Sequence, residues 1–154
     1  MNSFIKKLIA EEKLRLTEPS DEIAASYLLK SAKSLLSSKK LLEIENYDDA
    51  TALTYYSMYY AVLALFYKCG IKSENHAGTI ILLKEIFGIN NTGMAKAKKE
   101  RVDKQYYVDF KATKKEVDDG VNTAEEFNSK IRETIERLSK QQMKKYQEKI
   151  QEYF

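Results

Sequence analysis

An uncharged run from Ala50 to Tyr67 is the feature that most limits what this chain can fold into. The run, ATALTYYSMYYAVLALFY, interleaves tyrosines with small and large apolar residues, and Gly70 follows it closely. Its length reaches the roughly 18 residues that a membrane-spanning helix needs. However, hydroxyl groups in its middle would lack partners in hydrocarbon, and unpaired polar groups there are costly. The run therefore predicts the central helix of a soluble helical bundle, covered on most sides, with no membrane contact.

The overall composition also favours helices. The chain has 154 residues, with one proline and five glycines, and lysine, glutamate, leucine and alanine dominate it. These four residues have high helix propensity, whereas the β-branched alternation typical of strands is sparse. A chain of this length is expected to form one domain with a single core. We therefore predict an all-α fold.

Charge and cysteine content restrict the partners and the location only loosely. A net charge of +3 gives a weak long-range field, which neither requires nor excludes nucleic-acid binding. Cys69 is the single cysteine, so no internal disulfide can form, and its place after the apolar run predicts a buried thiol. The first residues are too charged for a secretory signal, so a cytoplasmic protein is expected. No metal site or cofactor is expected, because the usual motifs for them do not occur.

Start and stop signals divide the chain into predicted helices. Residues 1–18 are expected to form an amphipathic N-terminal extension, with a helix over residues 3–16 that docks on the bundle or on a partner. Residues 19–154 are expected to form the bundle. Ser20 caps its first helix, and Gly70 ends the central one. The predicted helices of the bundle cover residues 21–42, 47–69, 77–87, 94–107 and 114–153.

The last predicted helix is unusually long. It starts at a capping box formed by Thr113 and Glu116, in which each side chain pairs with the backbone of the other. Apolar residues at helical spacing then continue from Val117 through Ile150 to Tyr153. Such a helix would extend beyond a small bundle, and an apolar overhang usually contacts a partner. We therefore expect a homodimer.

Several spaced residues match the pattern of one known family. After the aromatic helix come a corner, a basic residue, a His-x-Gly and a leucine-rich helix, with Gly70, Lys72, His76, Gly78 and Leu82 in these places. Further on, Arg101 precedes Gln105, Tyr106 and Tyr107, and the last helix carries Ala124-Glu-Glu-Phe127. Over about residues 20–140 the chain resembles the HEPN domain family, in its small prokaryotic form associated with nucleotidyltransferases.

The resemblance implies a five-helix up-and-down bundle that is generally a homodimer. It also implies a role beside a minimal nucleotidyltransferase in a toxin–antitoxin pair, with nucleotide or RNA as ligand. Many members are metal-independent ribonucleases that use an Arg-x(4 to 6)-His motif on the fourth helix, paired across the dimer. Here Arg101 is present, but Tyr106 stands at the place of the histidine. Because the pKa of tyrosine is about 10, it is a poor acid or base for this reaction near neutral pH.

The catalytic candidates are Arg101, Tyr106 and His76, and two of them allow two interpretations. His76, the only histidine, is either an acid–base or phosphate-contacting group at the start of a helix, or it packs in the turn and hydrogen-bonds a neighbouring helix. Arg101 either binds phosphate with help from Lys98 and Lys104, or pairs with an acid inside the bundle.

The tyrosines of the central helix cannot all point inward, because their positions span a wide arc. Some should face a groove, a ligand or a dimer mate. Tyr106 and Tyr107 either stack on a base or belong to the core. The candidate binding residues are Tyr55, Tyr56, Tyr59, Tyr60, Lys72, Lys98, Lys104 and Tyr107.

The sequence leaves three functions open. The first is a dimeric HEPN-type bundle with little or no catalytic activity that binds a minimal nucleotidyltransferase, a nucleotide or RNA. The second is a metal-independent ribonuclease toxin with a degenerate Arg-x4-Tyr motif. The third is a structural or adaptor bundle without a ligand.

Overall fold

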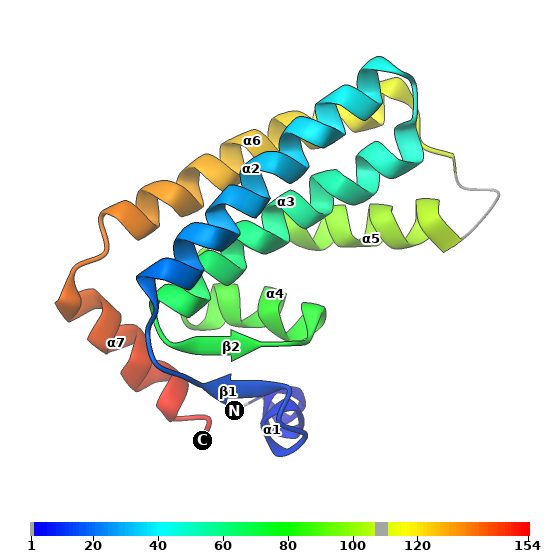
Figure 1. Ribbon diagram of the computed structural model, residues 1–154. Helices are drawn as coiled ribbons and strands as arrows, with labels where there is room; N and C mark the ends of the chain where they lie inside the picture. The colour runs from blue at the N-terminus through cyan, green and yellow to red at the C-terminus, as the bar shows by residue number, and fades with distance from the viewer. Residues whose placement is uncertain (1, 107–110) are drawn as a thin grey trace.

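The computed structural model describes residues 2–106 and 111–154, with only the backbone of Gln105 and Tyr106. In this part of the chain there are seven α-helices and two short strands (Figure 1). They are α1 (Ser3–Ala10), β1 (Leu14–Leu16), α2 (Asp21–Glu43), α3 (Tyr47–Lys68), β2 (Ile71–Ser73), α4 (His76–Glu85), α5 (Thr92–Tyr106), α6 (Lys114–Glu136) and α7 (Lys140–Gln151). The prediction of an all-α fold is confirmed. The described residues contain one helix more than predicted, because the predicted last helix is divided into α6 and α7.

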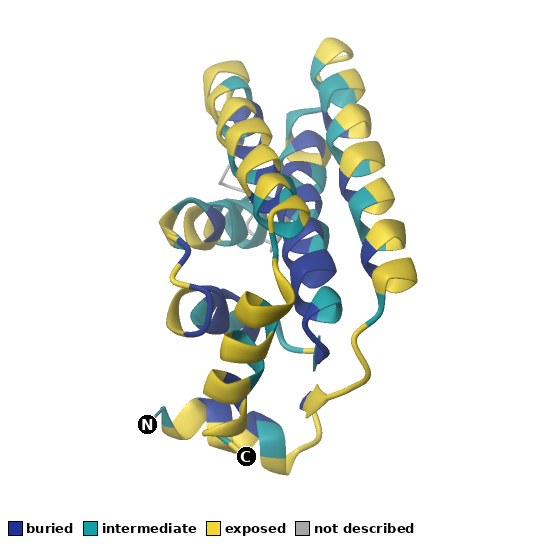
Figure 2. Ribbon diagram, turned by 90° about the vertical axis from the view of Figure 1, so that its left-hand side faces the viewer, coloured by how far each residue is buried: buried dark blue, intermediate teal, exposed yellow. Residues whose placement is uncertain are grey.

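Helix α3 is the central helix, as predicted from its uncharged run. Helices α2, α5 and α6 pack along it, and buried positions concentrate on it (Figure 2). Small residues of α2 let the two backbones approach closely: Ser31 Oγ donates to the Ser57 carbonyl at 2.6 Å, and Ser38 Oγ to the Ala50 carbonyl at 2.8 Å. No helix among the described residues has both the length and the apolar character to cross a membrane.

The N-terminal segment docks on the bundle, which was one of the two docking sites predicted for it. Ile5 and Leu8 are buried in the same core cluster as α3. The predicted helix over residues 3–16 is wrong in its last part, because α1 ends at Ala10 and Glu12 takes a positive φ of 58°. Residues Leu14–Leu16 then form β1, which pairs antiparallel with β2.

The corner at Gly70 sets the position of everything after α3. Gly70 has a φ of 77°, a conformation that glycine adopts without steric cost. Its carbonyl accepts a hydrogen bond from the Thr17 amide at 2.9 Å. A Cβ atom at Gly70 would lie only 2.5 Å from the Thr17 carbonyl oxygen. The corner therefore needs glycine both for its φ and for the close approach of the N-terminal segment.

The predicted long last helix is wrong, because it is two helices. Helix α6 ends at Glu136, and Ser139 starts α7 with its own capping box to Gln142. Helix α7 folds back onto the core, where Ile150 is fully buried and the Tyr146 ring packs against Phe87 at 4.6 Å between centroids. The overhang that suggested a homodimer is therefore absent from the described residues, and the homodimer remains a prediction from the resemblance alone.

Candidate functional site

Five side chains from three helices form a cluster of aromatic and cationic groups, the His76–Arg101 cluster. Its members are Tyr55, Tyr56 and Tyr59 from α3, His76 from the start of α4, and Arg101 from α5. The position of His76 follows from local sequence: Asn75 caps α4 by accepting a hydrogen bond from the Gly78 amide at 2.8 Å, which makes His76 the first helical residue. The Gly70 corner and β2 then bring this helix end against α3.

His76 is held by two tyrosines of α3. Its Nδ1 atom lies 2.7 Å from the Tyr55 hydroxyl, and its ring stacks on Tyr59 with 4.0 Å between centroids and 8° between planes. The interpretation that His76 hydrogen-bonds a neighbouring helix is therefore what the structure shows. The contact leaves Nε2 as the second polar atom of a half-buried ring.

The environment fixes the protonation of this pair. Burial lowers the pKa of His76 from its ordinary value of 6.5, and the positive charges of Arg101 and Lys98 lower it further. Burial also raises the pKa of Tyr55. At neutral pH a neutral imidazole therefore faces a protonated phenol. In the Nε2–H tautomer of His76 the Tyr55 hydroxyl donates to Nδ1, and in the Nδ1–H tautomer it accepts from that atom.

Arg101 lies over the rings of two tyrosines. Its Cζ atom is 5.3 Å from the Tyr56 ring centroid and 5.4 Å from that of Tyr55, within cation–π range. Its Nη1 atom donates to the Tyr56 hydroxyl at 3.1 Å. These contacts fix the orientation of the guanidinium group on the aromatic face of α3, at the side where His76 lies.

The prediction that the central tyrosines cannot all point inward is confirmed. Tyr55 is fully buried and Tyr59 nearly so, whereas Tyr56 and Tyr60 are half-buried. Tyr55 and Tyr59, both candidate binding residues, are buried and contact His76. Lys98 of α5 is close enough for its charge to lower the pKa of His76.

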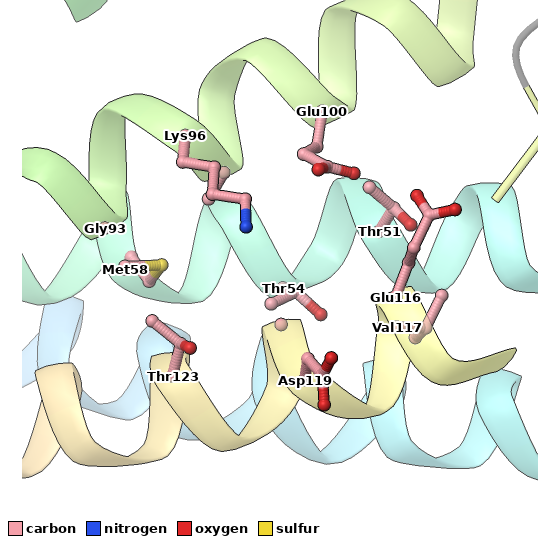
Figure 3. Close-up of a pocket in the computed structure, with 12 residues that line it drawn as sticks. Thr51, Thr54, Met58, Gly93, Lys96, Glu100, Glu116, Val117, Asp119 and Thr123 are labelled. Atoms are coloured by element: carbon pink, nitrogen blue, oxygen red, sulfur yellow. The ribbon is translucent and has the colours of Figure 1, made fainter. Parts of the chain in front are cut away.

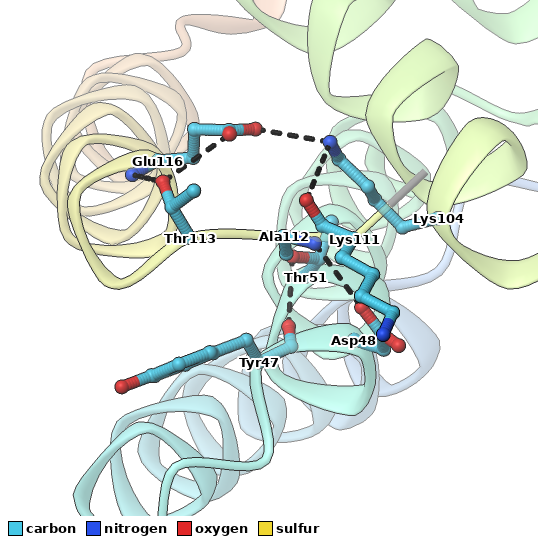
Figure 4. Close-up of polar contacts among 8 residues, drawn as sticks. All are labelled: Tyr47, Asp48, Thr51, Lys104, Lys111, Ala112, Thr113 and Glu116. Carbon is cyan, nitrogen blue, oxygen red and sulfur yellow. Dashed lines mark hydrogen bonds and ion pairs between the residues drawn. The ribbon is translucent and has the colours of Figure 1, made fainter. Parts of the chain in front are cut away.

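Two other candidates lie in different surroundings. Lys104 Nζ donates to the Lys111 carbonyl and contacts Glu116 Oε2, each at 3.2 Å (Figure 4). Lys104 therefore ties the end of α5 to the start of α6. Lys72 of β2 pairs with Glu74 at 3.3 Å. The Tyr106 side chain and Tyr107 lie outside the described residues.

Glu116 completes the contacts at the start of α6. Burial raises its pKa, but hydrogen bonds and charge from Lys104, with further hydrogen bonds from Thr113, outweigh this, so the net pKa lies below the usual value. Thr113 caps the helix as predicted, because its hydroxyl accepts a hydrogen bond from the Glu116 amide at 3.2 Å. The predicted helix start is confirmed.

A separate cavity of about 150 Å³ lies between α3, α5 and α6. Lys96 and Glu100 of α5 face Glu116 and Asp119 of α6 across it (Figure 3). None of the predicted site residues lines this cavity. Two glycines on facing helices, Gly93 of α5 and Gly120 of α6, also line it. No group of three or more potential metal ligands occurs in residues 2–106 and 111–154.

The sequence also failed to indicate two neighbours of the cluster. Tyr27 and Lys30 of α2 contact the Tyr60 ring. Tyr27 fits the helical spacing of a buried face on α2, but it is half-buried. Only the packing of α2 against α3 shows that these residues share a surface with Tyr60.

Comparison with known proteins agrees with this architecture. The family model described as the HEPN domain matches residues 24–138, which include every member of the His76–Arg101 cluster. No curated protein matches the chain.

Proposed function

Because the chain belongs to the HEPN domain family, we propose that it binds a nucleotide or RNA through the His76–Arg101 cluster. The observation that supports this is the meeting of Arg101, His76 and Tyr56 from three helices at one half-buried position. A guanidinium group can donate two parallel hydrogen bonds to a phosphate, and the Nε2–H of a neutral imidazole can add a third.

The cluster is preorganised for an anion. Arg101 is held by the rings of Tyr55 and Tyr56, and His76 by Tyr55 and Tyr59, so little side-chain freedom is lost when a ligand binds. Lys98 adds positive charge on the same side. The partly exposed Tyr56 ring offers a surface for a base.

The protonation state favours binding over catalysis. A general base needs an unprotonated nitrogen that can reach the 2′-hydroxyl group of RNA. We propose that His76 is in the Nε2–H tautomer, in which its unprotonated nitrogen is Nδ1 and accepts a hydrogen bond from the Tyr55 hydroxyl. We therefore infer that the protein cleaves RNA weakly or not at all, and that ribonuclease activity is the second candidate rather than the first.

We also propose, from the family, that the protein is a homodimer and acts with a minimal nucleotidyltransferase as its partner in a toxin–antitoxin pair. A neighbouring gene that encodes a Gly-Ser followed by paired aspartates would supply such a partner. Co-expression of the two proteins and co-purification through a tag on one of them tests this. If the two proteins elute separately, the partnership is excluded.

The binding proposal is tested with fluorescently labelled RNA and with a labelled adenosine monophosphate. Arg101→Ala should weaken binding of both by about tenfold or more, because a charge-assisted hydrogen bond is lost. Lys99→Ala is the matched control, since Lys99 lies on the same helix and is exposed. Equal binding by the wild type and the Arg101 variant would contradict the proposal. RNA cleavage that persists in EDTA and disappears in the Arg101 variant would instead establish the nuclease.

A further inference from the structure

Four half-buried tyrosines form a continuous row along the contact between α2 and α3. In order they are Tyr56, Tyr60, Tyr27 and Tyr67, which we call the tyrosine row. Successive ring centroids are 6.0, 6.0 and 5.4 Å apart, with interplanar angles of 24°, 28° and 9°. The first ring of the row contacts Arg101, so the row begins at the His76–Arg101 cluster and runs away from it.

Positively charged side chains lie beside the tyrosine row. The Lys30 Nζ atom lies 4.9 Å from the Tyr60 centroid and 5.9 Å from that of Tyr27. The charge of Lys72 reaches Tyr27, whereas at Tyr67 the negative charge of Glu74 outweighs the positive charge of Arg15. Two acids are also present: Glu74 pairs with both Arg15 and Lys72, and Asp21 pairs with Lys68. The positive charge of the row therefore lies at Tyr56, Tyr60 and Tyr27, where Arg101 and Lys30 are in cation–π range.

The chemistry of the row suits a chain of phosphates. Burial raises the pKa of Tyr27 and of Tyr67, so their hydroxyl groups stay protonated and can donate. Tyrosine hydroxyls, lysine and arginine are among the groups that contact nucleic-acid phosphates. The α3 backbone rises about 16 Å between Tyr56 and Tyr67. A mononucleotide cannot span that length, whereas a single strand can place several phosphates along it.

We propose that the tyrosine row is a track for single-stranded RNA, which leads from the His76–Arg101 cluster along the α2–α3 contact. This inference rests on the proposed function, because it extends the nucleotide site into a site for a longer ligand. Partly exposed aromatic rings flanked by cations are the features that single-strand-binding surfaces combine. A second copy of the chain fits less well, because it would bring the same positive charge against this surface.

The test compares a labelled oligouridylate of about ten nucleotides with labelled uridine monophosphate. Lys30→Gln and Tyr27→Leu should each weaken oligouridylate binding by about threefold to tenfold and leave binding of the mononucleotide unchanged. Lys30→Gln should also reduce the dependence of binding on salt concentration. Lys114→Gln is the charge-matched control, because Lys114 is exposed at the start of α6, near the opposite end of α3.

The outcomes separate this inference from the proposed function. If Arg101→Ala weakens both probes but the two row variants bind oligouridylate like the wild type, the track is wrong and the nucleotide site stands. If oligouridylate does not bind, or binds no more tightly than the mononucleotide, the track is also wrong. A change of molecular mass in the row variants, measured by light scattering, would identify the row as a self-association surface instead. Since Lys30 is exposed, Lys30→Gln still tests the proposed track if Tyr27→Leu destabilises the fold.

Discussion

The Tyr55 hydroxyl lies 2.7 Å from Nδ1 of His76, so a residue of the central helix fixes the ring of the only histidine in the chain. Tyr55 and His76 are 21 positions apart, and the Gly70 corner between them makes the contact possible. Because there is one histidine, its imidazole signals in an NMR spectrum can be assigned without ambiguity. The contact can therefore be tested directly.

Tyr55→Phe should raise the pKa of His76. In the Nε2–H tautomer the Tyr55 hydroxyl stabilises the neutral imidazole by donating to Nδ1, and its loss removes that preference. Titration of the His76 signals by NMR measures the change. Tyr47→Phe, at the first residue of α3, is the control and should leave the titration unchanged. A His76 pKa that stays the same in Tyr55→Phe would show that the hydrogen bond does not persist in solution.

Arg101→Gln should also raise the pKa of His76, for a different reason. After burial, the charge of Arg101 is the largest cause that lowers this pKa, and the substitution removes the charge. Lys98→Gln should act in the same direction with a smaller effect, because its charge contributes less. The same NMR titration measures both variants. If Arg101→Gln leaves the titration unchanged, Arg101 does not lie beside His76 in solution.

Folding stability should fall as the pH is lowered below about 6.5, the ordinary pKa of histidine. The pKa of His76 is lowered in the folded state, so the unfolded chain binds the proton more tightly, and the free energy of unfolding rises with pH in this range. This stabilisation is fully present above the pKa that His76 has in the unfolded chain. It is lost as the pH falls through the lower pKa that His76 has in the folded protein. Urea denaturation of the wild type and of His76→Gln across this range provides the measurement. Parallel curves for the two proteins would contradict the expectation.

The central helix and the Gly70 corner were predictable because their signals are local: an uncharged run, and a glycine where a positive φ is needed. The break between α6 and α7 was also encoded locally, in Ser139 and Gln142, but the apolar spacing through Ile150 concealed it. The strand β1 depends on a partner that lies far away in the sequence, so a helical pattern was assigned instead. The meeting of Tyr27 with Tyr60 likewise depends on how α2 packs on α3, which the sequence alone does not specify.

Gly70→Ala should destabilise the fold more than Gly88→Ala. Both glycines have a positive φ, which costs about 1–2 kcal/mol for alanine. At Gly88 a new Cβ atom meets nothing within 4 Å, whereas at Gly70 it would lie 2.5 Å from the Thr17 carbonyl oxygen. The difference between the two variants therefore isolates the close approach of the N-terminal segment. Equal losses in urea denaturation would mean that this segment can move away without cost.

Helix α7 should contribute to stability and should shield Cys69. Ile150 is fully buried, so Ile150→Ala should lower the free energy of unfolding by about 2–5 kcal/mol. Gln147 Nε2 of the same helix donates to the Cys69 carbonyl at 3.2 Å, and burial raises the pKa of the Cys69 thiol to about 12. The native thiol should therefore react slowly with a thiol reagent, and Ile150→Ala should make it react faster, because α7 detaches more often. Lys149→Ala, at the adjacent exposed position, should change neither stability nor reactivity. If α7 instead extended α6 away from the core, Ile150→Ala would resemble this control in both measurements.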